Sequence, residues 1–257
     1  MAFFIIILAS FTVSLLTFFS GFGLGTLLMP VMAVFFPVDI AIALTGVVHF
    51  SNNLFKIFLV GKKADKNVLI RFGIPAIVAA FLGAWLLIRL SELPPLYQYS
   101  AGSRLFLITP VKAVIAVILI IFAMLEIIPA FRKLEFNSNK LPWGGLLSGF
   151  FGGLSGMQGA IRSAFLVRTG LSKEAYIGTA VILSCFIDIT RLSVYATRFS
   201  NANLLDNLPL VISATVAAIA GAFIGNKLLK KITLGFIQKL VAIMLVILSL
   251  ALGLGLI

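Results

Sequence analysis

Gly152-Gly153-Leu154-Ser155-Gly156 interrupts a largely apolar run at residues 143–170. A related stretch, Ser20-Gly21-Phe22-Gly23-Leu24-Gly25, interrupts an earlier apolar run at residues 3–36. A membrane-spanning helix needs roughly 20 apolar residues, so the earlier run is too long for one crossing. Because clustered glycines break helices, we predict that each run forms two segments joined at its glycines.

The first run divides into segments at 3–20 and 22–36. Whether such a pair crosses the membrane twice or forms a re-entrant hairpin is left open, for the first run and for 143–157 alike. In either case the chain emerges on the side where it entered. Further apolar segments lie at 40–60, 68–90 and 106–128, and after the second break at 174–197, 207–226 and 236–256.

The order of segments after the second break repeats the order after the first. A shift of 135 residues places Ser20-Gly21 on Ser155-Gly156. The same shift pairs Asp39 with Glu174, Asn53 with Asp188 and Lys56 with Arg191. We therefore predict an internal duplication, with a first membrane repeat at 1–130, a cytoplasmic linker at 131–142 and a second membrane repeat at 143–257.

The composition is that of a membrane protein. Hydrophobic residues make up 61% of the 257 residues and charged residues 11%, whereas about a quarter of a soluble domain is charged. The net charge of +12 comes mostly from bases in short loops beside apolar runs, so membrane orientation explains it better than nucleic-acid binding. The predicted fold is an all-α polytopic membrane protein with about 8–10 membrane segments.

The distribution of bases predicts how the halves are oriented. Two segments per glycine-interrupted run give five elements per half, and an odd number inverts the second half. One side then carries Lys62, Lys63, Lys66, Arg71, Arg132, Lys133, Lys140, Arg168, Lys173, Lys227, Lys230, Lys231 and Lys239. The other side carries Arg89, Arg104, Lys112 and Arg198. Parallel halves would divide the bases almost evenly, so the positive-inside rule favours inverted repeats with both termini outside.

Two polar stripes occupy equivalent segments of the halves. Their members are Thr45, His49, Asn52, Asn53 and Lys56 in the first half and Ser184, Asp188 and Arg191 in the second. Spacings of three and four place each set on one helical face. In inverted repeats two such stripes would converge near a pseudo-twofold axis and form a site. The alternative is that they only hold the helices together by hydrogen bonds.

Three bases lie away from the loops: Lys56, Arg162 and Arg191. A charge at bilayer depth is costly, so it normally faces a polar interior and marks a functional site. Other interpretations stay open. The long side chains of Lys56 and Arg191 could reach the nearer interface, and Arg162 could lie at the inner interface beside Arg168.

The glycine breaks and the buried bases together favour an anion. A broken helix exposes backbone N–H groups and a positive dipole end, although glycines also serve close helix packing. Ser20 and Ser155 stand at the breaks as candidate caps. A guanidinium fits oxyanions such as sulfite, sulfonate, phosphate or carboxylate. The predicted substrate-binding residues are Arg162, Arg191, Lys56, Ser20, Ser155, Gln158, Asn52 and Asn53.

Asp188 and His49 are candidates for proton coupling, because both can change charge within a physiological range if their surroundings perturb them. The alternative for His49 is that it is simply hydrogen-bonded. Asp188 and Arg191 are three residues apart, a spacing that lets them pair.

An enzyme is not predicted. Gly153-Leu154-Ser155-Gly156 matches the G-x-S-G of intramembrane rhomboid proteases, but the single histidine, His49, lies upstream of the serine. The recurrence of Ser20-Gly21 makes a structural break the better explanation. We find no phosphate-binding loop, dinucleotide fingerprint or zinc-ligand cluster, so neither a metal nor a cofactor is expected.

With these residues in place, the chain resembles the sulfite exporter (TauE/SafE) family of membrane permeases. The resemblance rests on Ser20-Gly21-Phe22-Gly23-Leu24-Gly25 with Pro30, on Gly152-Gly153-Leu154-Ser155-Gly156, and on Gly83-Ala84-Trp85 with its echo Gly221-Ala222-Phe223. It covers essentially the whole chain and implies two inverted repeats, a basic substrate cavity and transport of sulfur-containing or organic anions such as sulfite or a sulfonate. It also implies a bacterial inner membrane.

The prediction is a secondary transporter for a small oxyanion, with the anion and the lipid bilayer as its partners. Two alternatives remain: an anion-selective channel and a non-transporting membrane subunit. A homodimer is left open as an oligomeric state, as are the substrate, the direction of transport and the coupling ion.

Overall fold

The computed structural model describes residues 1–17, 23–128, 130, 135–199, 207–228 and 234–257. Ser20 and residues 131–134 of the expected linker therefore lie outside the described residues.

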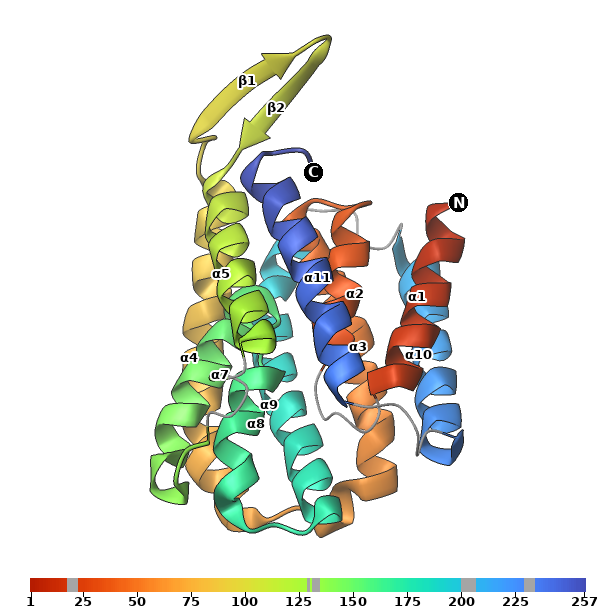
Figure 1. Cartoon of the computed structure of the whole chain (residues 1–257), viewed down its shortest axis with the longest axis vertical. Helices are drawn as coiled ribbons and strands as arrows, with labels where there is room; N and C mark the ends of the chain where they lie inside the picture. The colour runs from red at the N-terminus through yellow and green to blue at the C-terminus, as the bar shows by residue number, and fades with distance from the viewer. Residues whose placement is uncertain (18–22, 129, 131–134, 200–206, 229–233) are drawn as a thin grey trace.

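The chain forms a bundle of helices with one small β-hairpin (Figure 1). Its first half contains α1 (Ala2–Thr17), α2 (Leu24–Ala33), α3 (Val38–Val60), α4 (Lys66–Glu92) and α5 (Pro110–Ile127). Its second half contains α7 (Leu141–Ser155), α8 (Gly159–Leu166), α9 (Lys173–Phe199), α10 (Leu208–Leu228) and α11 (Leu234–Gly253). Short 3₁₀ turns are η1 (Gly61–Lys63), η2 (Ser138–Lys140) and η3 (Val167–Thr169).

Five helices in the described part of the chain are long and apolar enough to cross a membrane: α3, α4, α5, α9 and α10. Shorter apolar helices include α1 and α2. The all-α polytopic membrane fold predicted from the sequence is thus confirmed. The helices match the expected apolar segments within a few residues, except at 106–128, where α5 begins only at Pro110; α7 begins at Leu141, inside the expected linker.

The second glycine break joins α7 and α8 in a helical hairpin, and α1 and α2, on either side of the first break, run in opposite directions (Figure 1). At 1.5 Å per residue, α2 is about 15 Å long and α8 about 12 Å, too short for a hydrocarbon core of about 30 Å. In Figure 1, α1 descends from the end that carries the N-terminus and α2 returns toward that end. Gly156 closes α7 with a φ of 80° and Gly23 precedes α2 with a φ of 116°. Both values favour glycine, which explains why the breaks occur there.

Glycines bring α4 and α7 into backbone contact. A Cβ atom built on Gly145, Gly149 or Gly153 would lie 2.1–2.2 Å from a carbonyl oxygen of α4. This four-residue spacing is the small-residue pattern of closely packed membrane helices. In α7 these glycines therefore serve close helix packing, and the α7–α8 break follows directly after them.

The helix pairs α4–α7 and α10–α1 make the same kind of close glycine contact. A Cβ on Gly83 would meet the backbone of Phe150 and Leu154, and a Cβ on Gly221 would meet the backbone of Phe11 and Leu15. Each pair joins the fourth long element of one half to the first of the other. The inverted-repeat interpretation and its repeat boundaries stay predictions, and these contacts agree with them.

The β-hairpin was not predicted. Strand β1 (Tyr97–Ala101) pairs antiparallel with β2 (Arg104–Ile108) around Gly102, whose φ is 63°. The apolar segment expected to begin at 106 therefore starts as a strand, and α5 begins only at Pro110. Proline at the first helical position and Thr109 as its cap, accepting from the Lys112 N–H, set that boundary.

The two ends of the bundle differ in charge. Both chain termini and the hairpin lie at one end, and the α3–α4 and α8–α9 connections lie at the other (Figure 1). The bases in or beside those connections include Lys62, Lys63, Lys66, Arg168 and Lys173. Those beside the hairpin are Arg89, Arg104 and Lys112. The arrangement agrees with the predicted orientation, with the termini on the less basic side.

Candidate functional site

Helices α3 and α9 carry the two polar stripes and pack against each other. Every member of both stripes is buried: Thr45, His49, Asn52, Asn53, Lys56, Ser184, Asp188 and Arg191. Burying this many polar groups is unfavourable unless they find partners. Their contacts therefore define the candidate site.

Asp188 lies at the centre of the contacts. Its Oδ2 is 2.6 Å from Nδ1 of His49 on α3. Its Oδ1 accepts hydrogen bonds from Nε of Arg191 at 3.0 Å and from Nε2 of Gln158 at 3.2 Å, and Nη2 of Arg191 lies 2.8 Å away. The Asp188–Arg191 pair expected from the spacing is present, and it links α3, α9 and the start of α8.

Gln158 connects this cluster to a second buried base. The Arg162 Nη1 donates to Oε1 of Gln158 at 2.9 Å and to Oγ of Ser184 at 2.6 Å. Lys56 is close enough to Arg162 for their like charges to repel. Lys56 and Arg162 thus form a cationic group near the Asp188–Arg191 pair.

Arg191 has an open edge. It is 0% exposed, and apart from the Nη2–Asp188 ion pair and an interaction with the Tyr195 hydroxyl, its Nη1 and Nη2 have no hydrogen-bond partner among the described residues. A Cβ on Gly46 would lie 3.2 Å from its Nη2, and a Cβ on Gly156 would lie 2.9 Å from its Nη1. Glycines on α3 and at the α7–α8 break therefore leave room for this guanidinium.

The hairpin tips meet beside the same cluster. A Cβ on Gly25, in the first turn of α2, would lie 3.5 Å from the carbonyl oxygen of Gly156 and 3.6 Å from the ring of His49. The α8 helix starts just after Gly156, at Gly159. The N-terminal turn of α2 and that of α8 thus lie near the buried bases, and their dipoles add positive potential there.

The charges of the cluster do not balance. Lys56, Arg162 and Arg191 contribute three positive charges and Asp188 contributes one negative charge, while His49 is neutral or positive. Buried charges are tolerated when they are paired. An excess of positive charge with open guanidinium donors is an arrangement that can hold a small anion.

The structure brings some of the predicted site residues into one hydrogen-bond network and places others outside it. Arg162, Arg191, Gln158 and Asp188 share one network, and Asn53 joins it through Nδ2, 3.2 Å from either ring nitrogen of His49. Asn52 instead accepts a hydrogen bond from Ser14 of α1 at 3.4 Å, and its Nδ2 has no partner among the described residues. Ser20 lies outside the described residues.

Ser155 does not cap α8 as expected. The residue in the capping position is Gln158, whose side chain makes no capping bond. The Ser155 hydroxyl donates to the Phe151 carbonyl at 2.9 Å and accepts from the Met157 N–H at 3.4 Å. A serine hydroxyl reaches only its immediate neighbours, so Ser155 hydrogen-bonds with backbone groups at the end of α7 instead.

The interfacial interpretations of the three bases are not supported. Lys56 is 7% exposed, Arg162 2% and Arg191 0%. A side chain that reached the membrane interface would be exposed at its charged end. Protein contacts enclose all three.

Sequence reasoning missed Tyr195. It lies one helical turn after Arg191 on α9, is 2% exposed and donates a hydrogen bond to the Gly153 carbonyl on α7. Its spacing of four from Arg191 was the available signal, because it places both side chains on one face.

A protein family described as sulfite exporter TauE/SafE matches residues 6–252 of the chain. No curated protein and no solved structure matches the chain. The family match includes α1 through nearly all of α11, so it covers both glycine breaks and every residue of the cluster.

Proposed function

Because the chain belongs to the sulfite exporter TauE/SafE family of membrane permeases, we propose that it is a secondary transporter of a small sulfur-containing or organic anion, such as sulfite or a sulfonate. The family supports a transporter of sulfur-containing anions. The buried network supports the same reading by its chemistry, because it combines excess positive charge with hydrogen-bond donors.

The open edge of Arg191 is the observation that carries this proposal. Nη1 and Nη2 form a planar pair of donors, which fits two oxygens of one oxyanion. Leaving such donors unpaired inside a protein costs free energy. A bound anion would supply the missing acceptors. Gly46 and Gly156, which have no side chain, let the guanidinium lie close to their backbone.

The other cations and donors would assist. Lys56 and Arg162 would attract the anion through their charge, and Gln158 would hold both Arg162 and Asp188 in place. Alternating access would come from rocking of one repeat against the other around this site, as in other transporters built from inverted repeats. The setting we propose is a bacterial inner membrane, with both termini outside.

Transport by the purified protein in liposomes tests the function directly. We expect saturable uptake of sulfite or a sulfonate and counterflow of labelled anion against an unlabelled excess, because a carrier exposes one site to one side at a time. Acetate and phosphate serve as comparison anions. Steady, non-saturating current would instead show a channel, and no movement of any anion would show a non-transporting subunit.

We propose that the His49–Asp188 pair carries a coupled proton. Their 2.6 Å contact lies beside both Arg191 and Gln158, so an anion at Arg191 would change the field that acts on the pair. Protonation of the pair would then favour anion binding and anion release would favour deprotonation.

For His49→Gln we expect anion flux without anion-driven proton movement. Glutamine keeps hydrogen-bonding capacity but cannot take up a proton near neutral pH. A pH-sensitive dye inside the liposomes reports the proton, and labelled anion reports the flux. Ser249→Ala is the matched control, because Ser249 is buried but bonds to Ala116 on α5 instead. Unchanged proton movement in His49→Gln would rule the pair out as the coupling group.

A further inference from the structure

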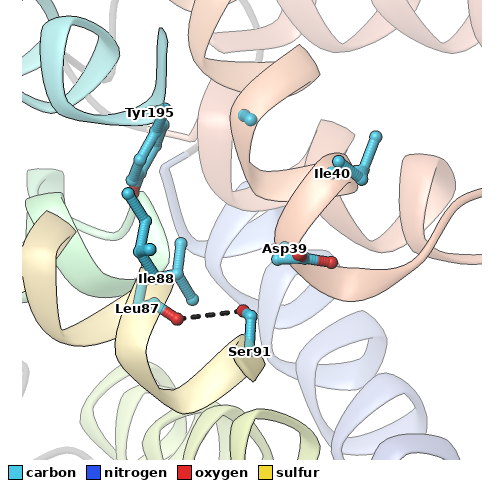
Figure 2. A pocket seen from close by; sticks show the side chains of 7 residues that line it. Asp39, Ile40, Leu87, Ile88, Ser91 and Tyr195 are labelled. Atoms are coloured by element: carbon cyan, nitrogen blue, oxygen red, sulfur yellow. Dashed lines mark hydrogen bonds between the residues drawn. The ribbon is translucent and has the colours of Figure 1, made fainter. Parts of the chain in front are cut away.

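A pocket opens toward the end of the bundle that carries the two termini. It is a shallow hollow where α3, α4 and α9 meet. Figure 2 shows Asp39 and Ile40 from α3, Leu87, Ile88 and Ser91 from α4, and Tyr195 from α9. It is thus a hollow beside the helices that carry the polar stripes.

Tyr195 connects this pocket with the buried cluster. It lines the pocket, yet it is 2% exposed, so only a small part of the side chain reaches solvent. Arg191 is one turn deeper on the same helix, and its positive charge acts on the Tyr195 hydroxyl. The Tyr195 side chain therefore adjoins both the pocket and Arg191.

A hydrogen bond holds Tyr195 in this position. Its hydroxyl donates to the carbonyl of Gly153, on the last turn of α7. Gly153 is three residues before Gly156, which faces Nη1 of Arg191. Movement of α9 away from the tip of α7 would break this bond and uncover Arg191 in the same step.

The pocket is poorly suited to hold an anion itself. Asp39 is the charged residue in its lining, and a carboxylate repels an anion. The Ser91 hydroxyl donates to the Leu87 carbonyl at 2.9 Å (Figure 2) and so is already engaged. The remaining lining is largely apolar. The lining therefore offers an anion no binding site of its own.

We propose that the pocket is the outer entrance of the anion path and that Tyr195 is the gate that closes it. This inference rests on the proposed transport function. In the closed state the ring covers Arg191 and the hydroxyl ties α9 to α7. In the open state the freed hydroxyl can donate to an anion that passes toward Arg191.

Accessibility of an introduced cysteine tests the gate without any substrate. The background is Cys185→Ala, because Cys185 is the single cysteine. Thr45→Cys places a buried thiol on α3, next to Gly46 in the sequence and further along the helix than the pocket residues Asp39, Ile40 and Ala43. Thr45 is 2% exposed and its hydroxyl has no hydrogen-bond partner among the described residues, so the change removes little. Ser91→Cys, in the pocket lining, is the positive control.

Reaction with an anionic methanethiosulfonate reagent added to the outside is the measurement. We expect Ser91→Cys to react at one rate whatever residue stands at 195. The Thr45→Cys thiol should react about tenfold faster with Tyr195→Phe, the order of change expected from loss of one buried hydrogen bond. Tyr195→Ala, which also removes the ring, should accelerate it further.

Tyr176→Phe is the matched control. Tyr176 lies on α9 near its opposite end and interacts with Ser163 of α8, so its loss should leave the Thr45→Cys rate unchanged. Equal rates in Tyr195→Phe, Tyr195→Ala and the parent would overturn the gate, and so would equal acceleration by Tyr176→Phe. If Tyr195→Ala does not fold, Tyr195→Phe still decides the question.

The gate and the transport function fail in different ways. Faster Thr45→Cys labelling together with no anion flux in the parent would overturn the proposed transport but keep the gate. Anion flux in the parent together with unchanged labelling would overturn the gate alone.

Discussion

Replacing Arg191 with alanine should abolish anion transport. Its Nη1 and the Nη2 hydrogen that does not face Asp188 are the donors available to an anion, and each charge-assisted hydrogen bond to a substrate contributes about 1.5–3 kcal/mol. Loss of two such bonds should lower flux at least about 100-fold. Arg191→Lys should recover little, because a lysine keeps the charge but not the planar fork. Flux of labelled anion into liposomes is the measurement.

Folding must be separated from binding in this experiment. Removing one partner of a buried ion pair costs about 3–5 kcal/mol, and Asp188 is fully buried. The double variant Asp188→Asn with Arg191→Gln removes both charges and keeps polar side chains at both positions. We expect it to insert and fold but not to transport.

Arg89→Ala is the control for a general loss of positive charge. Its side chain is 62% exposed and lies 3.4 Å from Glu92 at the bundle surface, so its removal should leave flux unchanged. Wild-type flux in a folded Arg191→Ala protein would show that this guanidinium does not hold the anion.

Gly149→Ala should destabilise the bundle strongly. The added Cβ would lie 2.2 Å from the Ala76 carbonyl oxygen and 2.7 Å from its Cα. Both are backbone atoms, so α4 and α7 must separate along the contact that Gly145 and Gly153 share. Overpacking of this kind costs up to about 3 kcal/mol, which corresponds to roughly 5–10 °C in Tm. Thermal unfolding in detergent measures the loss.

Gly253→Ala is the matched control, because a Cβ there would lie 3.8 Å from the Cβ of Ala116, an ordinary contact. It should leave Tm nearly unchanged. An equal Tm for Gly149→Ala and the parent protein would mean that α4 and α7 do not approach as closely as the structure has them.

Much of the fold was predictable because apolar length constrains membrane helices. Backbone polar groups cannot be left unpaired in lipid, so a long uncharged run has little choice but to form a helix. The segments at 40–60 and 174–197 therefore correspond to α3 and α9 within a few residues. The hairpin at 97–108 escaped prediction because its strand pairing depends on a tight turn at Gly102 rather than on apolar length.

The candidate site was partly predictable for a similar reason. A spacing of three or four fixes which residues share a helical face, so the stripes containing His49 and Asp188 could be read directly. The individual side-chain hydrogen bonds between helices could not be predicted from the spacing. Asn52 and Asn53 are adjacent, yet the first contacts α1 and the second contacts His49.

The amino-acid sequence alone determined that this chain is a polytopic helical protein with two glycine breaks and buried bases, because apolar length and periodicity act locally along each segment. Tertiary structure decided that the carboxylate of Asp188 meets His49, 139 residues away, and that the Tyr195 hydroxyl meets the Gly153 carbonyl of α7. Such contacts depend on how α3, α7 and α9 pack together. That packing arises from the fit of whole helix surfaces, which no single segment encodes.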